Sequence, residues 1–338
     1  MKILFIGGTG TISMAISGRL LAQGDELWLI NRGNRSTGLT GVHELHADVH
    51  NEQDTAAKLA GMTFDAVADF IAFTVADLER DFCLFAGKTK QFIFISSASA
   101  YQKPPADYLI TESTPLVNPY WEYSRNKIAG EDFLMEKYRK DGFPVTIVRP
   151  SHTFDERSVP VAVHGAKGSY QVLDRMLKNK PVIIPGDGTT FWTLTYNTDF
   201  AAGFTGLLGN PRALGQAVQI MSDERLSWNQ IYEIIADALG VPLNAVHISS
   251  DFLGTAGKQY DFQGELMGDK AYPVLFDISK LRRLVPSFHT ETTMAQGLRK
   301  TTAYIMSHTE CQIPDPEFDT WCDRVIAVRQ QALDSFLK

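Results

Sequence analysis

Residues 2–13 read KILFIGGTGTIS, an apolar run followed by a glycine-rich turn. Its apolar start predicts a buried strand, and Ile12, Ile16 and Leu20 recur at the spacing of a helix face. Glycines between a strand and a helix let the backbone approach a pyrophosphate, whose charge meets free N–H groups and the positive helix end. Ser13 stands where a third Gly or Ala is usual, but it is small enough for close packing. We expect the cofactor's phosphates to lie against Gly7, Thr9, Gly10, Thr11 and Ile12.

The first half of the chain continues to alternate apolar runs with helical patterns. Strands are predicted at 27–30, 66–70, 91–96 and 145–149, and helices at 54–60, 75–85 and 121–138. This alternation predicts an α/β fold with a Rossmann-type, doubly wound parallel sheet covered on both faces.

The regular alternation of predicted strands and helices ends after Pro150, where we expect a smaller C-terminal substrate lobe to begin. Ser227 and Gln230 form a capping-box pattern that opens a helix ending at Gly240. Two further amphipathic helices are predicted, around 293–306 and around 320–332. We expect residues 1–153 to form the dinucleotide-binding domain with 191–221 returning to it, and 154–190 and 222–338 to form the substrate-binding lobe and C-terminal helices.

Composition narrows the class of protein. The 338 residues carry 32 Lys and Arg against 39 Asp and Glu, a net charge of −7 that argues against a general nucleic-acid binder. Three scattered cysteines predict neither a disulfide framework nor a metal site and fit a reducing cytoplasm. No apolar run reaches the ~18 residues of a membrane span. His43, His46 and His50 are closely spaced, but we expect them near the adenine end of the cofactor rather than around a metal.

The residues after the second predicted strand bear on the choice of nucleotide. An acidic residue about 20 positions beyond the glycine turn normally receives the ribose hydroxyls. Asn31 and Arg32 stand there, with Arg35 nearby. Asn does not repel a 2′-phosphate, and Arg can stack on adenine and pair with that phosphate. We therefore favour NADP over NAD; the alternative is that Arg32 is a solvated loop charge.

A second group of residues suggests acid–base chemistry. Tyr123 and Lys127 are four apart on one helix face, where an ammonium stabilises the phenolate of a tyrosine. Ser96 and Ser97 end the predicted strand 91–96, at the sheet edge where ligands bind. A serine hydroxyl there can hold a substrate oxygen while Tyr123 moves its proton and the cofactor carries the hydride.

Four motifs in order, GGTGTIS, FIFISSASAY, YSRNK and IVRPSHTF, resemble the extended short-chain dehydrogenase/reductase superfamily, specifically its NAD-dependent epimerase/dehydratase family. The resemblance spans Met1 to Gly240. It implies catalytic roles for Ser97, Tyr123 and Lys127, and a homodimer through the helices at 75–85 and 121–138. Further cofactor contacts are assigned to Asp48, Val49, Phe70, Ile71, Ala72, Ser96, Tyr123, Lys127, Pro150, Ser151 and His152.

Two departures from that family bear on the substrate. Its 4,6-dehydratases carry an Asp-Glu pair after the catalytic hydroxyl, whereas this chain has Ala98 and Ser99, so dehydration is not expected. Trp192 stands where an Arg usually grips a nucleoside diphosphate. Either another cation replaces it or the substrate is not a sugar nucleotide; Trp192 as a core aromatic is the alternative. We assign Ser99, Tyr101 and Trp192 to the substrate pocket, with packing roles left open.

These observations favour an NAD(P)-dependent oxidoreductase or epimerase that acts on a hydroxyl or carbonyl carbon of a small sugar-like or sugar-nucleotide substrate. The alternative to an enzyme is an RNA-binding protein built on the same scaffold. A basic surface would distinguish such a protein from the enzyme. A cofactor-sensing protein without turnover is a third possibility, and a blocked Ser97 or Tyr123 would favour it.

Overall fold

The computed structural model describes residues 1–34 and 37–337 and is built around a seven-stranded sheet in which every pairing is parallel. The strand order is β12-β7-β5-β4-β1-β2-β3. The strands are β1 (Lys2–Ile6), β2 (Glu26–Asn31), β3 (Val42–His46), β4 (Ala66–Asp69), β5 (Phe92–Ile95), β7 (Val145–Pro150) and β12 (Gln216–Ile220). The predicted Rossmann-type fold class is confirmed.

The order of the strands places a crevice beside β1. From β1 the chain builds outward through β2 and β3, then crosses to the other side of β1 and continues with β4. Adjacent connections therefore leave the sheet edge in opposite directions at this point, and ligands of doubly wound sheets bind there, beyond the carboxyl ends of the strands.

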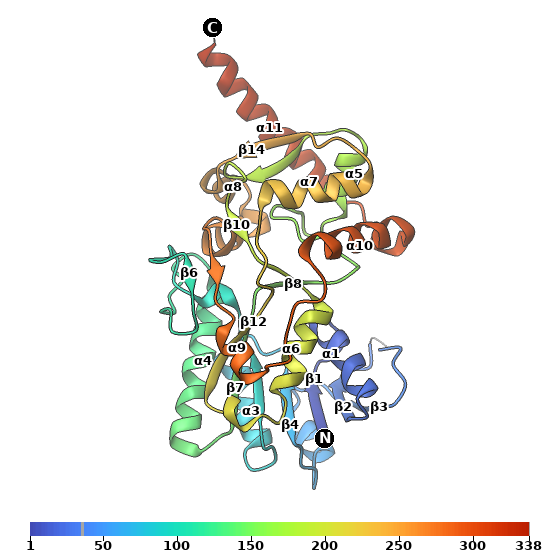
Figure 1. Cartoon of the computed structure of the whole chain (residues 1–338), viewed down its shortest axis with the longest axis vertical. Helices are drawn as coiled ribbons and strands as arrows, with labels where there is room; N and C mark the ends of the chain where they lie inside the picture. The colour runs from blue at the N-terminus through green and yellow to red at the C-terminus, as the bar shows by residue number, and fades with distance from the viewer. Residues whose placement is uncertain (35–36, 338) are drawn as a thin grey trace.

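Side chains alternate between the two faces of the sheet. Ile3 and Phe5 belong to the hydrophobic cluster that includes α1 and α6, whereas Leu4 and Ile6 belong to the cluster that includes α3 and α4. Both faces are thus covered by helices (Figure 1). The helices of this half are α1 (Thr11–Ala22), α2 (Glu52–Lys58), α3 (Val75–Phe85), α4 (Glu122–Asp141) and α6 (Asn197–Leu207).

The second half of the molecule forms a lobe of helices and short two-stranded ladders, at the end from which α11 projects (Figure 1). Its helices are α5 (Tyr170–Leu177), α7 (Trp228–Leu239), α8 (Ser250–Ala256), α10 (Met294–Ser307) and α11 (Pro316–Phe336), whereas α9 (Ser279–Leu284) packs against α6 and β12 of the sheet (Figure 1). The short strands are β6 (Leu109–Ile110), β8 (His152–Phe154), β9 (Val182–Pro185), β10 (Phe191–Trp192), β11 (Leu194–Tyr196), β13 (Leu226–Ser227), β14 (Ala245–Ile248) and β15 (Leu275–Phe276).

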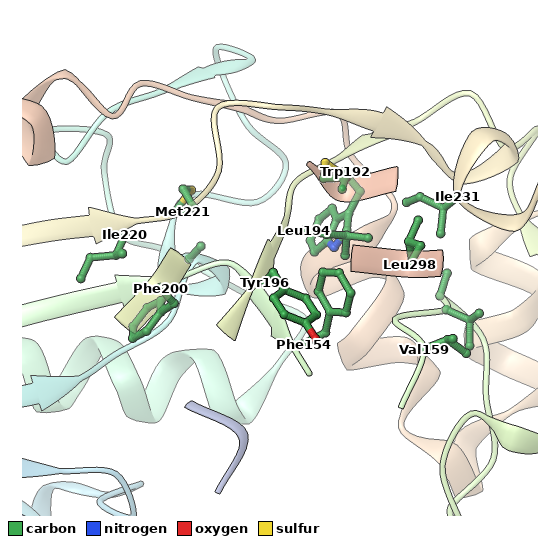
Figure 2. Close-up of a cluster of buried hydrophobic side chains, with 14 of the residues drawn as sticks. Phe154, Val159, Trp192, Leu194, Tyr196, Phe200, Ile220, Met221, Ile231 and Leu298 are labelled. Carbon is green, nitrogen blue, oxygen red and sulfur yellow. The ribbon is translucent and has the colours of Figure 1, made fainter. Parts of the chain in front are cut away.

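One hydrophobic cluster joins the lobe to the sheet. Figure 2 shows part of it, where Phe154 and Tyr196 lie between Phe200 of α6 and Leu298 of α10. The rings of Phe154 and Tyr196 meet edge to face with centroids 5.3 Å apart. The two halves therefore share a core, and the lobe is held in a fixed place above the crevice.

Some elements differ from the predicted ones. The capping box at Ser227 and the left-handed Gly240 bound α7 as predicted. α11 begins earlier than expected because Asp315 caps it and Pro316 occupies its first turn. Residues 263–270, for which no helix was predicted, form the π-helical segment η4 (Gln263–Lys270). In residues 1–34 and 37–337, no helix is long and apolar enough to cross a membrane.

Candidate active site

The glycine turn after β1 has the backbone that a dinucleotide requires. Gly7 and Gly8 have φ of 92° and 105°, in the region that side chains avoid. A Cβ on Gly8 would lie 2.7 Å from Leu29 Cδ2. The helix that follows begins at Thr11 and has no acidic residue in its first turn, so its positive end is available to an anion.

A cleft of about 650 Å³ extends from this turn over the ends of β2 and β3. The Asn31 carboxamide oxygen accepts a hydrogen bond from the Gly33 N–H at 2.7 Å. Its Nδ2 is buried and has no hydrogen-bond partner among the described residues. The cleft is lined by Gly7, Thr9, Ile30, Asn31, Arg32, Asn34, Ala47, Asp48, Val49, His50, Ile71 and Phe73. These features fit a dinucleotide; Arg35 lies outside the described residues.

The loop after β4 is fixed by a buried carboxylate. Asp69 accepts a hydrogen bond from the Ala72 N–H at 2.8 Å and pairs with Arg80 at 3.1 Å. Arg80 also pairs with Asp81 at 2.8 Å. This network holds the predicted Phe70–Ala72 loop against the cleft, with Ile71 exposed on its surface.

Lys127 lies at the base of the site, where the loop after β4 meets the end of β5. Its Nζ donates to the carbonyls of Ala72 and Ile95 at 2.7 and 2.8 Å. It lies 5.6 Å from the centre of the Tyr123 ring. Burial lowers the Lys127 pKa to about 8, and the carboxylates of Asp69 and Asp77 act in the opposite direction.

Hydroxyl groups connect the end of β5 to α4. The Ser97 and Ser99 oxygens are 2.9 Å apart, and Ser124 of α4 donates to Ser99 at 2.7 Å. Burial raises the Tyr123 pKa, and interaction with the Ser97 side chain acts to lower it. Ser97, Tyr123 and Lys127 thus come from β5 and α4 to one place, at the carboxyl edge of the sheet.

A small pocket of about 180 Å³ adjoins these residues on the lobe side. Pro150 and Ser151 continue from β7 into its wall, and the Ser151 hydroxyl lies 3.1 Å from that of Thr195. Burial lowers the pKa of His152 to about 3, so its imidazole is neutral. The lining comprises Ser97, Ala98, Ser99, Trp121, Tyr123, Pro150, Ser151, His152, Trp192, Asp269 and Phe276.

The structure places two of the expected site residues away from this pocket. Ser96 is buried and donates to Glu131 of α4 at 2.5 Å, and Glu131 in turn pairs with Arg149. Tyr101 is 1% exposed and donates to Gln219 at 2.8 Å. Both are held in the core, because polar partners far along the chain, Glu131 on α4 and Gln219 on β12, satisfy their hydroxyls there.

Trp192 combines the two roles that the sequence left open. Its side chain lines the pocket yet is only 3% exposed, and its ring stacks on that of Trp228 with centroids 5.7 Å apart. Its indole nitrogen is buried and has no hydrogen-bond partner among the described residues.

Sequence reasoning missed Asp269, Trp121 and Phe276 in the pocket, since no local motif marks them. It also missed Arg157, which pairs with Asp155 and donates to the Thr11 hydroxyl at 3.3 Å, beside the start of α1. These residues reach the site through the packing of the lobe on the sheet, which sequence spacing does not reveal.

Comparisons with known proteins agree with this arrangement. The model of the NAD dependent epimerase/dehydratase family matches residues 81–220. A 2′-dehydrokanamycin reductase from Streptomyces kanamyceticus is 26% identical over 290 residues, 85% of this chain and 80% of that protein. The chloroplast stem-loop binding protein of 41 kDa b from Arabidopsis thaliana is 24% identical over 71% of this chain and 64% of that protein.

Among solved structures, UDP-glucuronic acid 4-epimerase from Bacillus cereus, in complex with UDP-glucuronic acid and NAD, has the same fold. Its TM-score is 0.72 at 20% identity, over 91% of this chain and 99% of that one. Residues 81–220 thus match the NAD dependent epimerase/dehydratase family, and the doubly wound sheet with its carboxyl-edge site is similar in fold to solved structures that include such an epimerase.

Proposed function

We propose that the protein catalyses hydride transfer between NAD(P) and a hydroxyl- or carbonyl-bearing carbon of a sugar-like substrate. The observation that carries this proposal is the convergence of Ser97, Tyr123 and Lys127 between the dinucleotide-sized cleft and the small pocket. The likeness to a 2′-dehydrokanamycin reductase supports action on a carbonyl of a sugar-like ring.

The bound dinucleotide would supply or accept the hydride. Tyr123 transfers the proton of the substrate oxygen, because its hydroxyl stands beside Ser97 and its ring beside the Lys127 ammonium. Ser97 donates a hydrogen bond to the same oxygen and orients it. Lys127 stabilises the phenolate, and its carbonyl partners Ala72 and Ile95 keep it in place.

We further propose that residues 1–153 with 191–221 hold the dinucleotide and that residues 154–190 and 222–338 form the substrate-binding lobe. Asp269 and Phe276 are the pocket-lining residues of the lobe, and the other lining residues belong to the first group.

The Tyr123→Phe variant tests the chemistry. It removes the proton donor but leaves the ring, so we expect the dinucleotide to bind normally while turnover falls about 100-fold or more. The measurement is dinucleotide absorbance at 340 nm with a panel of sugar ketones and alcohols, in parallel with calorimetric binding. Full turnover by the variant would refute the assignment of Tyr123 as the proton donor. If the wild type does not bind either dinucleotide, the proposed enzymatic function is wrong and the RNA-binding alternative is favoured.

We further propose that NADP binds more tightly than NAD. Arg32 is exposed at the rim of the cleft beside Asn31, and no acidic residue occupies either position. The Arg32→Ala variant should lose about tenfold in NADP affinity and little in NAD affinity, measured by calorimetry. Equal losses for both dinucleotides would mean that Arg32 contacts the adenine rather than a 2′-phosphate.

A further inference from the structure

Asp269 places a carboxylate in the substrate pocket that the proposed chemistry does not use. Its side chain lines the pocket together with Ser97 and Tyr123, and it lies close enough to influence the Tyr123 pKa. In the described part of the chain, no hydrogen bond or ion pair reaches its oxygens. Asp269 is half-buried, with its carboxylate facing the pocket rather than bulk water, so a ligand that supplies a partner gains from the pairing.

The backbone around Asp269 is held by contacts from both halves of the molecule. Asn118, just before α4, donates to the Gly268 carbonyl at 2.7 Å, and the Trp228 indole donates to the Lys270 carbonyl at 3.2 Å. Gly264 and Gly268 leave no room for side chains, since Cβ atoms there would lie 2.2 and 2.8 Å from Trp121 atoms. The position of Asp269 is therefore set by the fold, and the π-helical turn of η4 carries it to the pocket.

The neighbouring cations do not neutralise Asp269 by direct contact. Lys270 pairs with Glu265 at 2.6 Å. Lys103 is buried and attracts Asp269 electrostatically, but no ion pair joins the two in the described chain. No described residue that lines the pocket is Lys or Arg, and His152 is neutral. A phosphate group would therefore meet a carboxylate there and no direct counter-charge.

Four aromatic rings line the same pocket as this carboxylate. Trp121, Trp192, Tyr123 and Phe276 all line the pocket, and the Trp121 and Tyr123 ring centroids are 4.8 Å apart. Aromatic faces attract cations, and a carboxylate accepts strong charge-assisted hydrogen bonds from an ammonium. The pocket volume is about 180 Å³, against about 650 Å³ for the cleft that fits the dinucleotide.

We propose that the pocket binds an amine-bearing sugar ring without a nucleoside diphosphate, and that Asp269 pairs with its ammonium group. This inference rests on the proposed function, since it assigns the substrate class of the same site. Asp269 is thus a binding residue that determines specificity, while the reacting oxygen lies at Ser97 and Tyr123.

The test is calorimetric binding to the full chain saturated with its preferred dinucleotide. The probes are 2-amino-, 3-amino- and 6-amino-deoxyglucose, each compared with glucose and with UDP-glucose. At least one amino sugar should bind about tenfold more tightly than glucose, the ratio expected of one charge-assisted hydrogen bond. The Asp269→Asn variant should lose this preference, while Asp251→Asn, the same change on the exposed face of α8, should keep it.

Thermal unfolding of the same variants separates binding from a structural role. Burial raises the pKa of Asp269 to about 6, so the ionised group opposes folding at neutral pH. Asp269→Asn should therefore raise Tm in the free protein, and Lys103→Met should not weaken amine binding. A lower Tm for Asp269→Asn would instead mark a structural pair with Lys103 and overturn the proposal.

Other results would also overturn it. If glucose binds as tightly as every amino sugar, and Asp269→Asn weakens the binding of both equally, then Asp269 accepts hydrogen bonds from hydroxyl groups rather than from an ammonium. If UDP-glucose binds more tightly than the amino sugars, the substrate is a sugar nucleotide. These binding results do not depend on turnover, so an inactive protein that prefers amino sugars would refute the proposed hydride transfer and leave this inference standing.

Discussion

Lys127 illustrates how burial alters a single residue. The fold removes its ammonium from water and lowers its pKa from 10.5 to about 8. Between these values the unfolded chain binds the proton and the folded protein has released it, so unfolding free energy rises with pH in this window. Below pH 8 Lys127 is protonated in both states, and the cost of burying its charge then lowers the unfolding free energy by its full amount.

We expect this effect to appear in the difference between the wild type and Lys127→Met. Relative to the variant, the wild type should gain on the order of 3 kcal/mol of unfolding free energy between pH 8 and pH 10.5. Urea unfolding across this range measures the difference. A difference that is constant over the range would show that Lys127 keeps an ordinary pKa in the folded state.

Residues show where sequence reasoning succeeds and where it stops. The four-residue spacing predicts that Tyr123 and Lys127 share a helix face, because helical periodicity is local, and on α4 the Lys127 ammonium lies 5.6 Å from the centre of the Tyr123 ring. Tyr101 was assigned to the pocket because it follows β5, but its hydroxyl bonds to Gln219 on β12, a partner that no local pattern indicates. Asp269 was missed for the same reason, since Asn118 and Trp228 fix its backbone from distant parts of the chain.

At the level of elements, predicted strands agreed best where apolar runs were continuous. Residues 91–96 and 145–149 were predicted as strands, and β5 and β7 lie within a residue of these limits. The central parallel sheet buries both faces of such strands, so the signal is strong. The π-helical η4 has no comparable signal, because its form depends on packing against Trp121.

That packing gives a prediction for η4. The Gly264→Ala variant places a Cβ 2.2 Å from Trp121 Cδ1, so either the indole or the segment must move. Because Trp121 and Asp269 both line the pocket, sugar binding should weaken at least about tenfold while dinucleotide binding stays unchanged, as measured by calorimetry.

Gly18→Ala is the matched control for this change. Gly18 lies inside α1 with nothing within 4 Å of an added Cβ. We therefore expect Gly18→Ala to raise the unfolding free energy by about 0.5–1 kcal/mol and to leave ligand binding unaltered. Normal sugar affinity in Gly264→Ala would show that η4 tolerates displacement and does not position the pocket wall.

For the whole molecule, the exposed side of α3 and α4 is the surface on which we expect a homodimer. Small side chains reach solvent there, including Ala76 and Cys83 on α3 and Ala129 on α4. A dimer of the type that the family resemblance implies would pack these helices against their copies. Light scattering after size exclusion should give twice the chain mass, and Ala129→Arg should give the monomer with its dinucleotide binding intact. A wild-type monomer at all concentrations would refute this interface.

The position of β12 has a consequence for how the chain is made. A ribosome releases β7 long before β12, because residues 151–215, with the first part of the lobe, are translated between them. Until Gln216–Ile220 emerges, the hydrogen-bonding edge of β7 is open, and such edges recruit other chains. We therefore expect the nascent chain to be most prone to aggregation before β12 emerges, and a chain that ends at residue 153 to keep the edge of β7 open.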